Sequence, residues 1–236
     1  MENPLVSIII PAYNEEAYIE RALESIKRQS YDRLETIVVA NACRDDTARI
    51  ARSYTDNVIE TPVRGMSKAN NLGTTVAQGS IFTFMDADSQ MKENLLEQVY
   101  LSVVKGYEVG KAKIRPLDDN GLIAKGFCLY QELIAQLLGP IPGFDSGTGG
   151  FTFATSELFK KLEKIYGYGF NPDLDVMLDV DFMTRAKKHG NYKFITESCL
   201  FTSMRRFAEE GYIKCFIEDA IHGMNPKGKT RKRWQN

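Results

Sequence analysis

Residues 80–91 read SIFTFMDADSQM, a stretch that joins a predicted buried strand to a pair of acids. The run from Ile81 to Met85 is apolar and β-rich, which is typical of a strand inside a core. Asp86 and Asp88 follow at once. A carboxylate near a core is unfavourable unless it is paired, hydrogen-bonded or bound to a metal ion, so two of them at a strand end indicate a binding site. The alternative is an acidic turn in which DSQMKEN begins a helix.

The sequence around this stretch alternates apolar strands with amphipathic helices. Further strands are predicted at residues 5–11, 34–40 and 57–61, and helices at residues 14–30, 44–55, 66–79 and 92–106. This alternation predicts an α/β fold in which a mostly parallel, Rossmann-like sheet is flanked by helices. Ligands of such sheets bind beyond the carboxyl ends of the strands, which is where the two aspartates are placed.

The second half of the chain is less regular. Strands are predicted at residues 107–117, 151–155 and 191–203, and helices at residues 121–139, 156–167, 175–190 and 205–223. Because no low-complexity linker interrupts the chain, we expect a single domain in two halves. These halves are residues 1–110 and 111–226, followed by a basic tail at residues 227–236.

Composition and missing motifs argue against several classes of protein. A formal net charge of −1 gives no global attraction to nucleic acid. The four cysteines form no CxxC pair, so neither a zinc site nor a disulfide framework is indicated. The motif GxGxxG is missing after the first strand, which argues against a nicotinamide enzyme. Neither a signal peptide nor an apolar run of about 18 residues is recognised, so a cytoplasmic enzyme is expected.

Five segments occur in an order and spacing that resemble those of the family-2 glycosyltransferases: VSIIIPAYNEE, ETIVVANACRDDT, MSKANNLGTTVAQGSIFTFMDADS, GGF and LDVDFMTRAKKHG. The resemblance covers roughly residues 4–210 and implies the GT-A fold. It also implies transfer of a sugar from a nucleotide diphosphate donor to an acceptor hydroxyl with inversion, assisted by Mn²⁺ or Mg²⁺. The first half would bind the donor, and the second half a glycan, lipid-linked or small-molecule acceptor.

The resemblance implies a nucleoside pocket at the end of the first strand. Its predicted residues are Pro11, Ala12 and Tyr13, with Tyr13 against the base, and Glu15 near the ribose. The acidic pair that the family usually carries after the second strand is replaced here by Ala40 and Asn41. Because an asparagine offers both a donor and an acceptor, Asn41 can still pair with a base edge. Uracil is the first expectation, and guanine and thymine stay open.

The resemblance also implies a metal site at Asp86, Ala87 and Asp88, which match the DxD motif of the family. Asp88 is the expected metal ligand, and Asp86 would bind the ribose or a metal-bound water. Mg²⁺ and Mn²⁺ suit such oxygen ligands. The bound ion would offset the charge that develops on the diphosphate leaving group.

Four basic or histidine side chains are further candidates, each with an alternative. Lys68 is either a cation near the nucleotide or a solvated surface residue. Arg205 and Arg206 either contact the diphosphate or form structural salt bridges. His222 is either a C-terminal metal ligand or a surface residue at a helix end.

On the acceptor side, the resemblance implies that an aspartate deprotonates the acceptor hydroxyl. Asp179 in LDVDF is the best match, and Asp181 is the competing candidate. Residues i and i+2 of a helix point about 200° apart, so both cannot face one pocket. Leu178 stands where the family usually carries another acid. Gly149 and Gly150 either allow close approach of the donor sugar or acceptor, or form a plain turn.

Two segments bear on possible partners. Residues 127–141 are largely apolar and form either core, a homodimer contact or a wall for a lipid-linked acceptor. The tail is either solvated or held to an anionic membrane surface, where the protein would be peripheral. Its basic residues, beside Trp234, are Lys227, Lys229, Arg231, Lys232 and Arg233.

Two other functions remain open at this point. A nucleotidyltransferase would need a basic, glycine-rich loop after the first strand, whereas PAYNEE is acidic. A non-catalytic sensor or scaffold that binds nucleotide sugars fits the loss of the family's acids at Ala40 and Leu178.

Overall fold

Eight strands and eight helices are present in the part of the chain that the computed structural model describes, residues 3–119, 121–141, 145, 149–174, 177–212 and 214. The strands are β1 (Val6–Ala12), β2 (Leu34–Asn41), β3 (Val58–Thr61), β4 (Ile81–Met85), β5 (Ser89–Met91), β6 (Val109–Pro116), β7 (Phe151–Thr155) and β8 (Tyr192–Thr202). The helices are α1 (Ile19–Lys27), α2 (Thr47–Arg52), α3 (Met66–Val76), α4 (Leu95–Val104), α5 (Leu122–Leu138), α6 (Ser156–Tyr166), α7 (Leu178–Ala186) and α8 (Arg205–Glu210).

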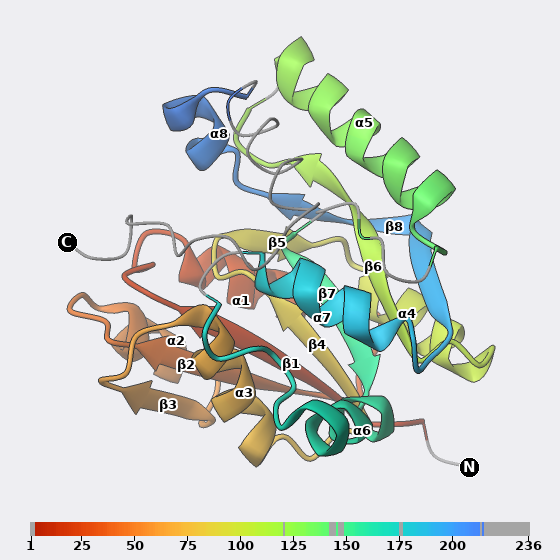
Figure 1. Ribbon diagram of the computed structural model, residues 1–236. Helices are drawn as coiled ribbons and strands as arrows, with labels where there is room; N and C mark the ends of the chain where they lie inside the picture. Colours follow the sequence, from red (N-terminus) through yellow and green to blue (C-terminus); the bar gives the residue numbers. More distant parts are fainter. Residues whose placement is uncertain are drawn as a thin grey trace.

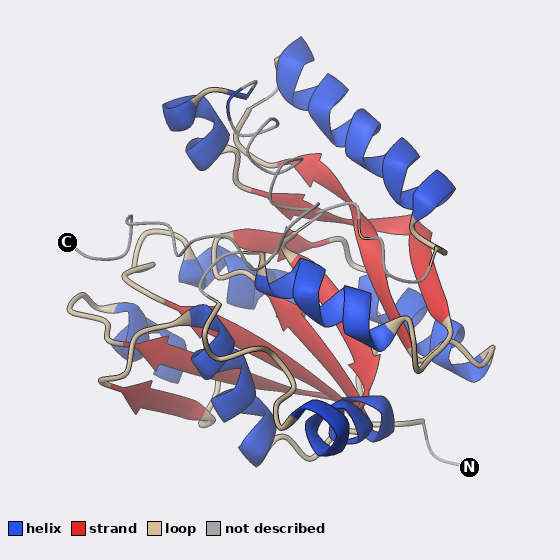
Figure 2. Ribbon diagram, in the orientation of Figure 1, coloured by secondary structure: helices blue, strands red, loops and turns tan. Residues whose placement is uncertain are grey.

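The strands form one sheet in the order β3-β2-β1-β4-β7-β6-β8-β5, with helices on both faces (Figures 1 and 2). The first four strands in this order are parallel to one another. Their side chains are apolar on both faces because helices cover both, and Ile8, Ile9 and Ile10 are fully buried. The α/β prediction with flanking helices is confirmed.

Strand β7 makes the sheet mixed, because it runs antiparallel to both β4 and β6. In this register Phe151, the first residue of β7, lies opposite Met85, the last residue of β4. The segment before β7 therefore meets the carboxyl end of β4. The pairing also joins both predicted halves of the chain in one sheet, since β7 lies between β4 and β6.

Two elements differ from the sequence prediction. Residues 89–91 form β5, which pairs with β8, so DSQMKEN does not begin a helix directly after the DxD motif. The helix predicted at residues 205–223 is interrupted, because α8 ends at Glu210 and Gly211 follows with a φ of 89°, whereas Tyr212 and Lys214 are again helical. A positive φ is accessible to glycine without a steric penalty, and it stops the helix there. Residues from 215 onward lie outside the described part.

Separate hydrophobic clusters lie on the two faces of the sheet. One joins the sheet to α1, α2 and α4, and the other joins it to α3, α6 and α7. A third, smaller cluster lies under α5, where Phe127 packs against Phe207 and Tyr212. These clusters hold the sheet rigid, so the loops at its carboxyl edge are supported from both faces.

Candidate active site

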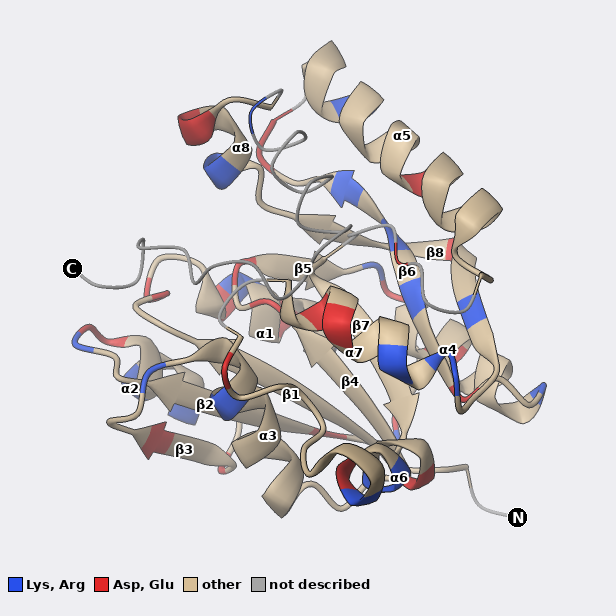
Figure 3. Cartoon of the chain, viewed as in Figure 1, with Lys and Arg blue, Asp and Glu red and all other residues tan. Residues whose placement is uncertain are grey.

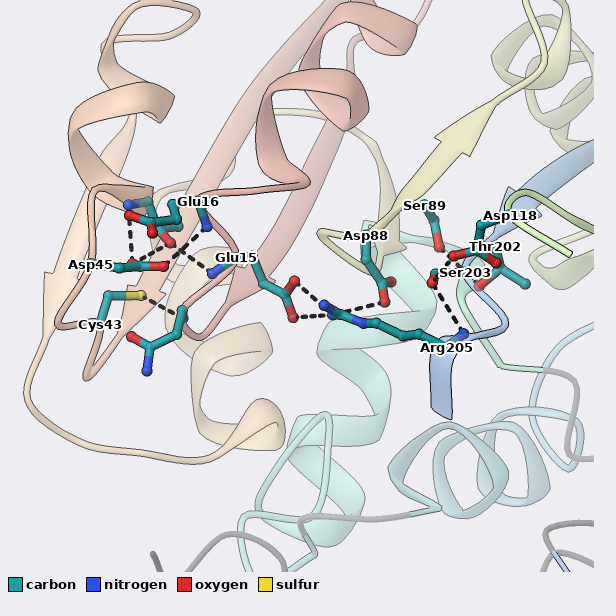
Figure 4. Close-up of polar contacts among 12 residues, drawn as sticks. Glu15, Glu16, Cys43, Asp45, Asp88, Ser89, Asp118, Thr202, Ser203 and Arg205 are labelled. Carbon is teal, nitrogen blue, oxygen red and sulfur yellow. Dashed lines mark hydrogen bonds and ion pairs between the residues drawn. The ribbon is translucent and has the colours of Figure 1, made fainter. Parts of the chain in front are cut away.

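The loops after β1 and β2 are tied together by hydrogen bonds at the carboxyl edge of the sheet. The backbone N–H of Glu15 donates to Oγ1 of Thr47 at 2.8 Å, and that of Glu16 donates to Oδ2 of Asp45 at 3.0 Å (Figure 4). Asn14 has a φ of 53°, a left-handed conformation that asparagine tolerates better than most residues. The loop therefore turns sharply after β1, and Glu15 extends toward Arg205 (Figure 4).

Asn41, the predicted contact of the nucleobase, is buried, and its side chain forms hydrogen bonds within the protein. Its Nδ2 donates to the carbonyl of Ala12 at 2.8 Å, and its Oδ1 accepts from the N–H of Gly65 at 3.2 Å. This residue therefore joins the end of β1 to the start of α3. Tyr13 lies on the same edge, where the guanidinium of Arg64 is 4.1 Å from the centroid of its ring. The base-binding roles of Tyr13 and Asn41 stay predictions.

Arg205, at the start of α8, bridges two of the predicted acids (Figure 4). Its Nη2 lies 2.7 Å from both carboxylate oxygens of Glu15 and 3.0 Å from Oδ2 of Asp88. The guanidinium also stacks over the ring of Tyr18, with 4.1 Å between its central carbon and the ring centroid. The salt-bridge alternative for Arg205 is therefore what the structure shows, and its contact with a diphosphate stays a prediction.

The start of α8 is held by a neighbouring loop. Asp118 accepts hydrogen bonds from the hydroxyl of Ser203 and, at 2.7 Å, from the N–H of Met204. Ser89 in β5 donates to the hydroxyl of Thr202 at 3.1 Å, which fixes the end of β8 beside the DxD motif (Figure 4). Arg205 thus approaches Asp88 from an anchored segment.

The acids at this edge crowd one another. Burial, together with the charges of Asp88 and Asp179, raises the pKa of Asp86 to about 7. Burial also raises the pKa of Glu15 and that of Asp88, although Arg205 acts in the opposite direction on both. A further cation bound among these acids would relieve their repulsion.

Asp179, at the start of α7, belongs to the same site as Asp86. The charge of Asp179 acts on Asp86, as does that of Arg206 in the opposite direction. Gly149 and Gly150 lie against this pair: a Cβ built on Gly149 would be 3.7 Å from Oδ2 of Asp179, and one on Gly150 would be 3.7 Å from Oδ2 of Asp86. With a φ of 91°, Gly150 also has a backbone conformation that favours glycine.

Asp181, the competing base, is occupied elsewhere. Its Oδ2 accepts from Nε and Nη2 of Arg185 at 2.9 and 2.6 Å, and the same Nη2 donates to the carbonyl of Gly169. This ion pair links one turn of α7 to the loop after α6. Leu178 is buried in the cluster beneath α7, so its side chain belongs to the core. The structure therefore brings Asp179, and not Asp181, to the acid cluster.

Two candidates remain, Lys68 and His222. Lys68 is exposed on α3, so its nucleotide contact stays a prediction. His222 lies outside the described residues.

The oxygen ligands at this edge suit a hard divalent cation. Among the described residues, no three His, Cys, Asp or Glu side chains form a complete metal-binding group. Mg²⁺ and Mn²⁺ commonly use one or two carboxylates and complete their coordination with substrate phosphates and water. Asp86 and Asp88, whose pKa values are raised chiefly by burial, fit such a shared site.

Sequence reasoning missed Lys111, a basic residue of this site. Lys111, on β6, is fully buried and contacts Asp179. Nothing in the local pattern marks it, since a lysine within a strand usually faces solvent. Its partner Asp145 lies in the glycine-rich segment before β7, 34 residues away.

The family model described as glycosyl transferase family 2 matches residues 7–149. Glycosyltransferase GlyG of Streptococcus pneumoniae serotype 4 is 26% identical over 171 residues, which cover 66% of this chain and 57% of GlyG. The chain thus spans little more than half the length of that relative.

Two solved structures are similar in fold. Mannosyltransferase PcManGT from Pyrobaculum calidifontis, in complex with GDP-Man and Mn²⁺, has a TM-score of 0.71 at 20% identity, covering 98% of this chain and 67% of its own. Glucosyl-3-phosphoglycerate synthase from Mycobacterium tuberculosis, with Mg²⁺ and UDP, has a TM-score of 0.63 at 21% identity, covering 93% of this chain and 79% of its own. These similarities confirm the expected GT-A fold. Because the family model matches more than half of the 236 residues, the chain belongs to glycosyl transferase family 2.

Proposed function

We propose that the chain transfers a sugar from a nucleotide diphosphate donor to an acceptor hydroxyl, with inversion at the anomeric carbon. The observation that carries this proposal is the convergence of Asp86 and Asp88, at the end of β4, with Asp179 on α7. Acids that bind a metal-diphosphate and an acid that takes a proton are the two parts that such a transfer needs.

In the proposed reaction, Asp179 accepts the proton of the acceptor hydroxyl as that oxygen attacks the anomeric carbon. The new carbon–oxygen bond forms on the face opposite the diphosphate, and the bond from the anomeric carbon to the phosphate oxygen breaks. Its electron pair leaves with the nucleoside diphosphate. Attack on the opposite face inverts the anomeric configuration.

Asp86 and Asp88 would hold Mg²⁺ or Mn²⁺ together with the diphosphate oxygens. When bound, the ion supplies positive charge to the leaving group. Arg205 now occupies the space between Glu15 and Asp88, so we propose that it changes partners when the donor binds and then contacts the diphosphate.

The identity of the nucleobase in the donor is proposed from two residues. Tyr13 would lie against the base, and Asn41 retains one N–H beyond the bond that it makes to Ala12. UDP remains the first expectation, while GDP and dTDP are alternatives. Similar folds bind both kinds of nucleotide, since PcManGT was solved with GDP-Man and the M. tuberculosis synthase with UDP.

The test is thermal unfolding with UDP, GDP and dTDP, each with and without Mn²⁺. A ligand at 100 times its Kd stabilises the folded state by about 2.7 kcal/mol, which for a chain of this size raises Tm by roughly 5–11 °C. We expect one nucleotide to give this shift only with Mn²⁺, and Asp88→Ala to lose it. Asp173→Ala, at an exposed position outside the site, is the matched control and should keep it. If no nucleotide shifts Tm, the donor site does not exist.

A second candidate is a non-catalytic sensor of nucleotide sugars, which the substitutions at Ala40 and Leu178 favour. Such a protein would bind donor and metal but release no free nucleoside diphosphate with any acceptor. Release of nucleoside diphosphate that depends on an added acceptor would rule out the sensor.

Apart from its substrates, the protein has an apolar surface on α5 that bears on its proposed partners. The exposed side of α5 is apolar and the helix carries few charges (Figure 3), with Leu122, Leu133 and Leu137 between 50% and 88% exposed. We propose that residues 127–141 contact a second copy of this chain, a lipid-linked acceptor or the cytoplasmic face of a membrane. Among the described residues, no helix is both long and apolar enough to cross a bilayer. The basic tail lies outside the described residues.

A further inference from the structure

A buried cluster of charged side chains joins Lys111 on β6 to Asp145 and to Asp179 on α7. The Nζ of Lys111 is 2.6 Å from Oδ2 of Asp145 and 3.1 Å from Oδ2 of Asp179. The side chains of Lys111 and Asp145 are 0% exposed, whereas that of Asp179 is 23% exposed. Lys187 also belongs to the cluster, with its Nζ 3.2 Å from Oδ1 of Asp145 and 4.1 Å from the centroid of the Tyr192 ring.

The two lysines share Asp145, but of the two only Lys111 forms an ion pair with Asp179. Fully buried lysines are rare unless they are paired. Lys187 already provides Asp145 with a counter-ion, so core pairing alone does not explain a second lysine. Although burial acts to lower it, the pKa of Lys111 is raised by the carboxylates of Asp145 and Asp179, so the lysine stays charged.

Asp179 needs a cationic partner because it lies among acids. Its charge is one of those that disfavour ionisation of Asp86. Without a counter-ion, a partly exposed carboxylate at this place would be driven away from Asp86 by repulsion. The contact with Lys111 engages Oδ2 of Asp179, which leaves the other carboxylate oxygen to accept a proton.

We infer that Lys111 is a positioning residue that holds the carboxylate of Asp179 in place to reach the acceptor hydroxyl, an inference that rests on the proposed role of Asp179 as the base. Lys111 is fully buried, so it touches no substrate itself. Its proton stays on Nζ while the acceptor proton passes to Asp179. The same lysine ties Asp179 to Asp145, and hence to the glycine-rich segment that leads to Gly149 and Gly150.

Lys111→Met tests this inference, and Lys187→Met is the matched control, because each removes one buried lysine from Asp145 but only the first removes the ion pair of Asp179. We expect Lys111→Met to lower kcat about 10²-fold, the order of loss that misplacement of a reacting group causes. Donor binding should stay within about twofold, and Lys187→Met should keep kcat within about threefold. Lys111→Gln retains a hydrogen-bond donor and should keep an intermediate kcat; it also serves if the methionine variant does not fold.

Two further measurements separate a positioning role from general damage. In an Asp179→Asn background, Lys111→Met should lower kcat no further, since the group that it positions is already lost. A crystal structure of Lys111→Met should show the Asp179 carboxylate displaced, and that of Lys187→Met should not. Equal losses of kcat in the two lysine variants, or an undisplaced Asp179, would overturn the inference. A displaced carboxylate in a protein whose wild type transfers no sugar would instead refute the proposed function alone.

Discussion

Asp179→Asn is expected to lower kcat for sugar transfer by about 10²–10⁴-fold, the usual contribution of a general base. Asparagine keeps the size of the side chain and can still accept a hydrogen bond from Lys111, but it cannot take the acceptor proton. Because the donor is bound by other residues, the Kd of the preferred nucleotide with Mn²⁺ should stay within about twofold. Calorimetric titration with that nucleotide and steady-state release of nucleoside diphosphate measure the two quantities.

Asp181→Asn is the control for this prediction. It weakens the pair with Arg185, in which the two side chains are 19% and 8% exposed, so it should lower stability and leave kcat within a few-fold. A loss of kcat in Asp181→Asn with normal turnover in Asp179→Asn would exchange the two assignments. Normal turnover in both would remove the aspartate base from the mechanism.

Gly110→Ala is expected to lower the free energy of unfolding by about 3 kcal/mol, the upper part of the range for an overpacked core. A Cβ at Gly110 would lie 2.1 Å from the carbonyl oxygen of Lys193 and 2.4 Å from the ring of Phe153, so a backbone atom of β8 must shift. For a chain of this size the loss corresponds to a fall of roughly 6–12 °C in Tm, measured by calorimetry or circular dichroism.

The matched control is Gly126→Ala on α5. A Cβ there would meet no atom within 4 Å, and replacing glycine by alanine within a helix stabilises it by about 0.5–1 kcal/mol. Tm should therefore rise slightly in this variant. A Gly110→Ala protein as stable as the wild type would contradict the close packing of β6 between β7 and β8.

The parallel part of the fold could be predicted because its signals are local. Strands β1, β2 and β4 are apolar runs, and the acids that follow β4 stand out against them. Strand β5 could not be predicted, since Ser89–Met91 has no apolar run and is a strand only through its pairing with β8. The direction of β7 was equally hidden, because it depends on which strands, distant in sequence, become its neighbours.

In the candidate site, too, some contacts have a local signal in the sequence and others have none. The contrast between Asp179 and Asp181 was partly present in the sequence, because Arg185 stands four residues after Asp181 and such pairs form on one helix face. The contact between Lys111 and Asp179 joins residues 68 positions apart, so no local pattern contains it. The hydrogen bonds of Asn41 with Ala12 and Gly65 could not be predicted either, because they depend on how the fold places these residues.

The bridge from Arg205 to Glu15 also sets an order of events during synthesis of the protein. The two residues are 190 positions apart, and Asp88 likewise precedes the arginine by about half of the chain. A ribosome therefore releases both acids long before the cation that neutralises them. The donor half can form its parallel strands early, but Glu15 and Asp88 gain this partner only when residue 205 leaves the exit tunnel. Nascent chains stopped before that point carry Glu15 and Asp88 without the guanidinium that pairs with both in the folded protein.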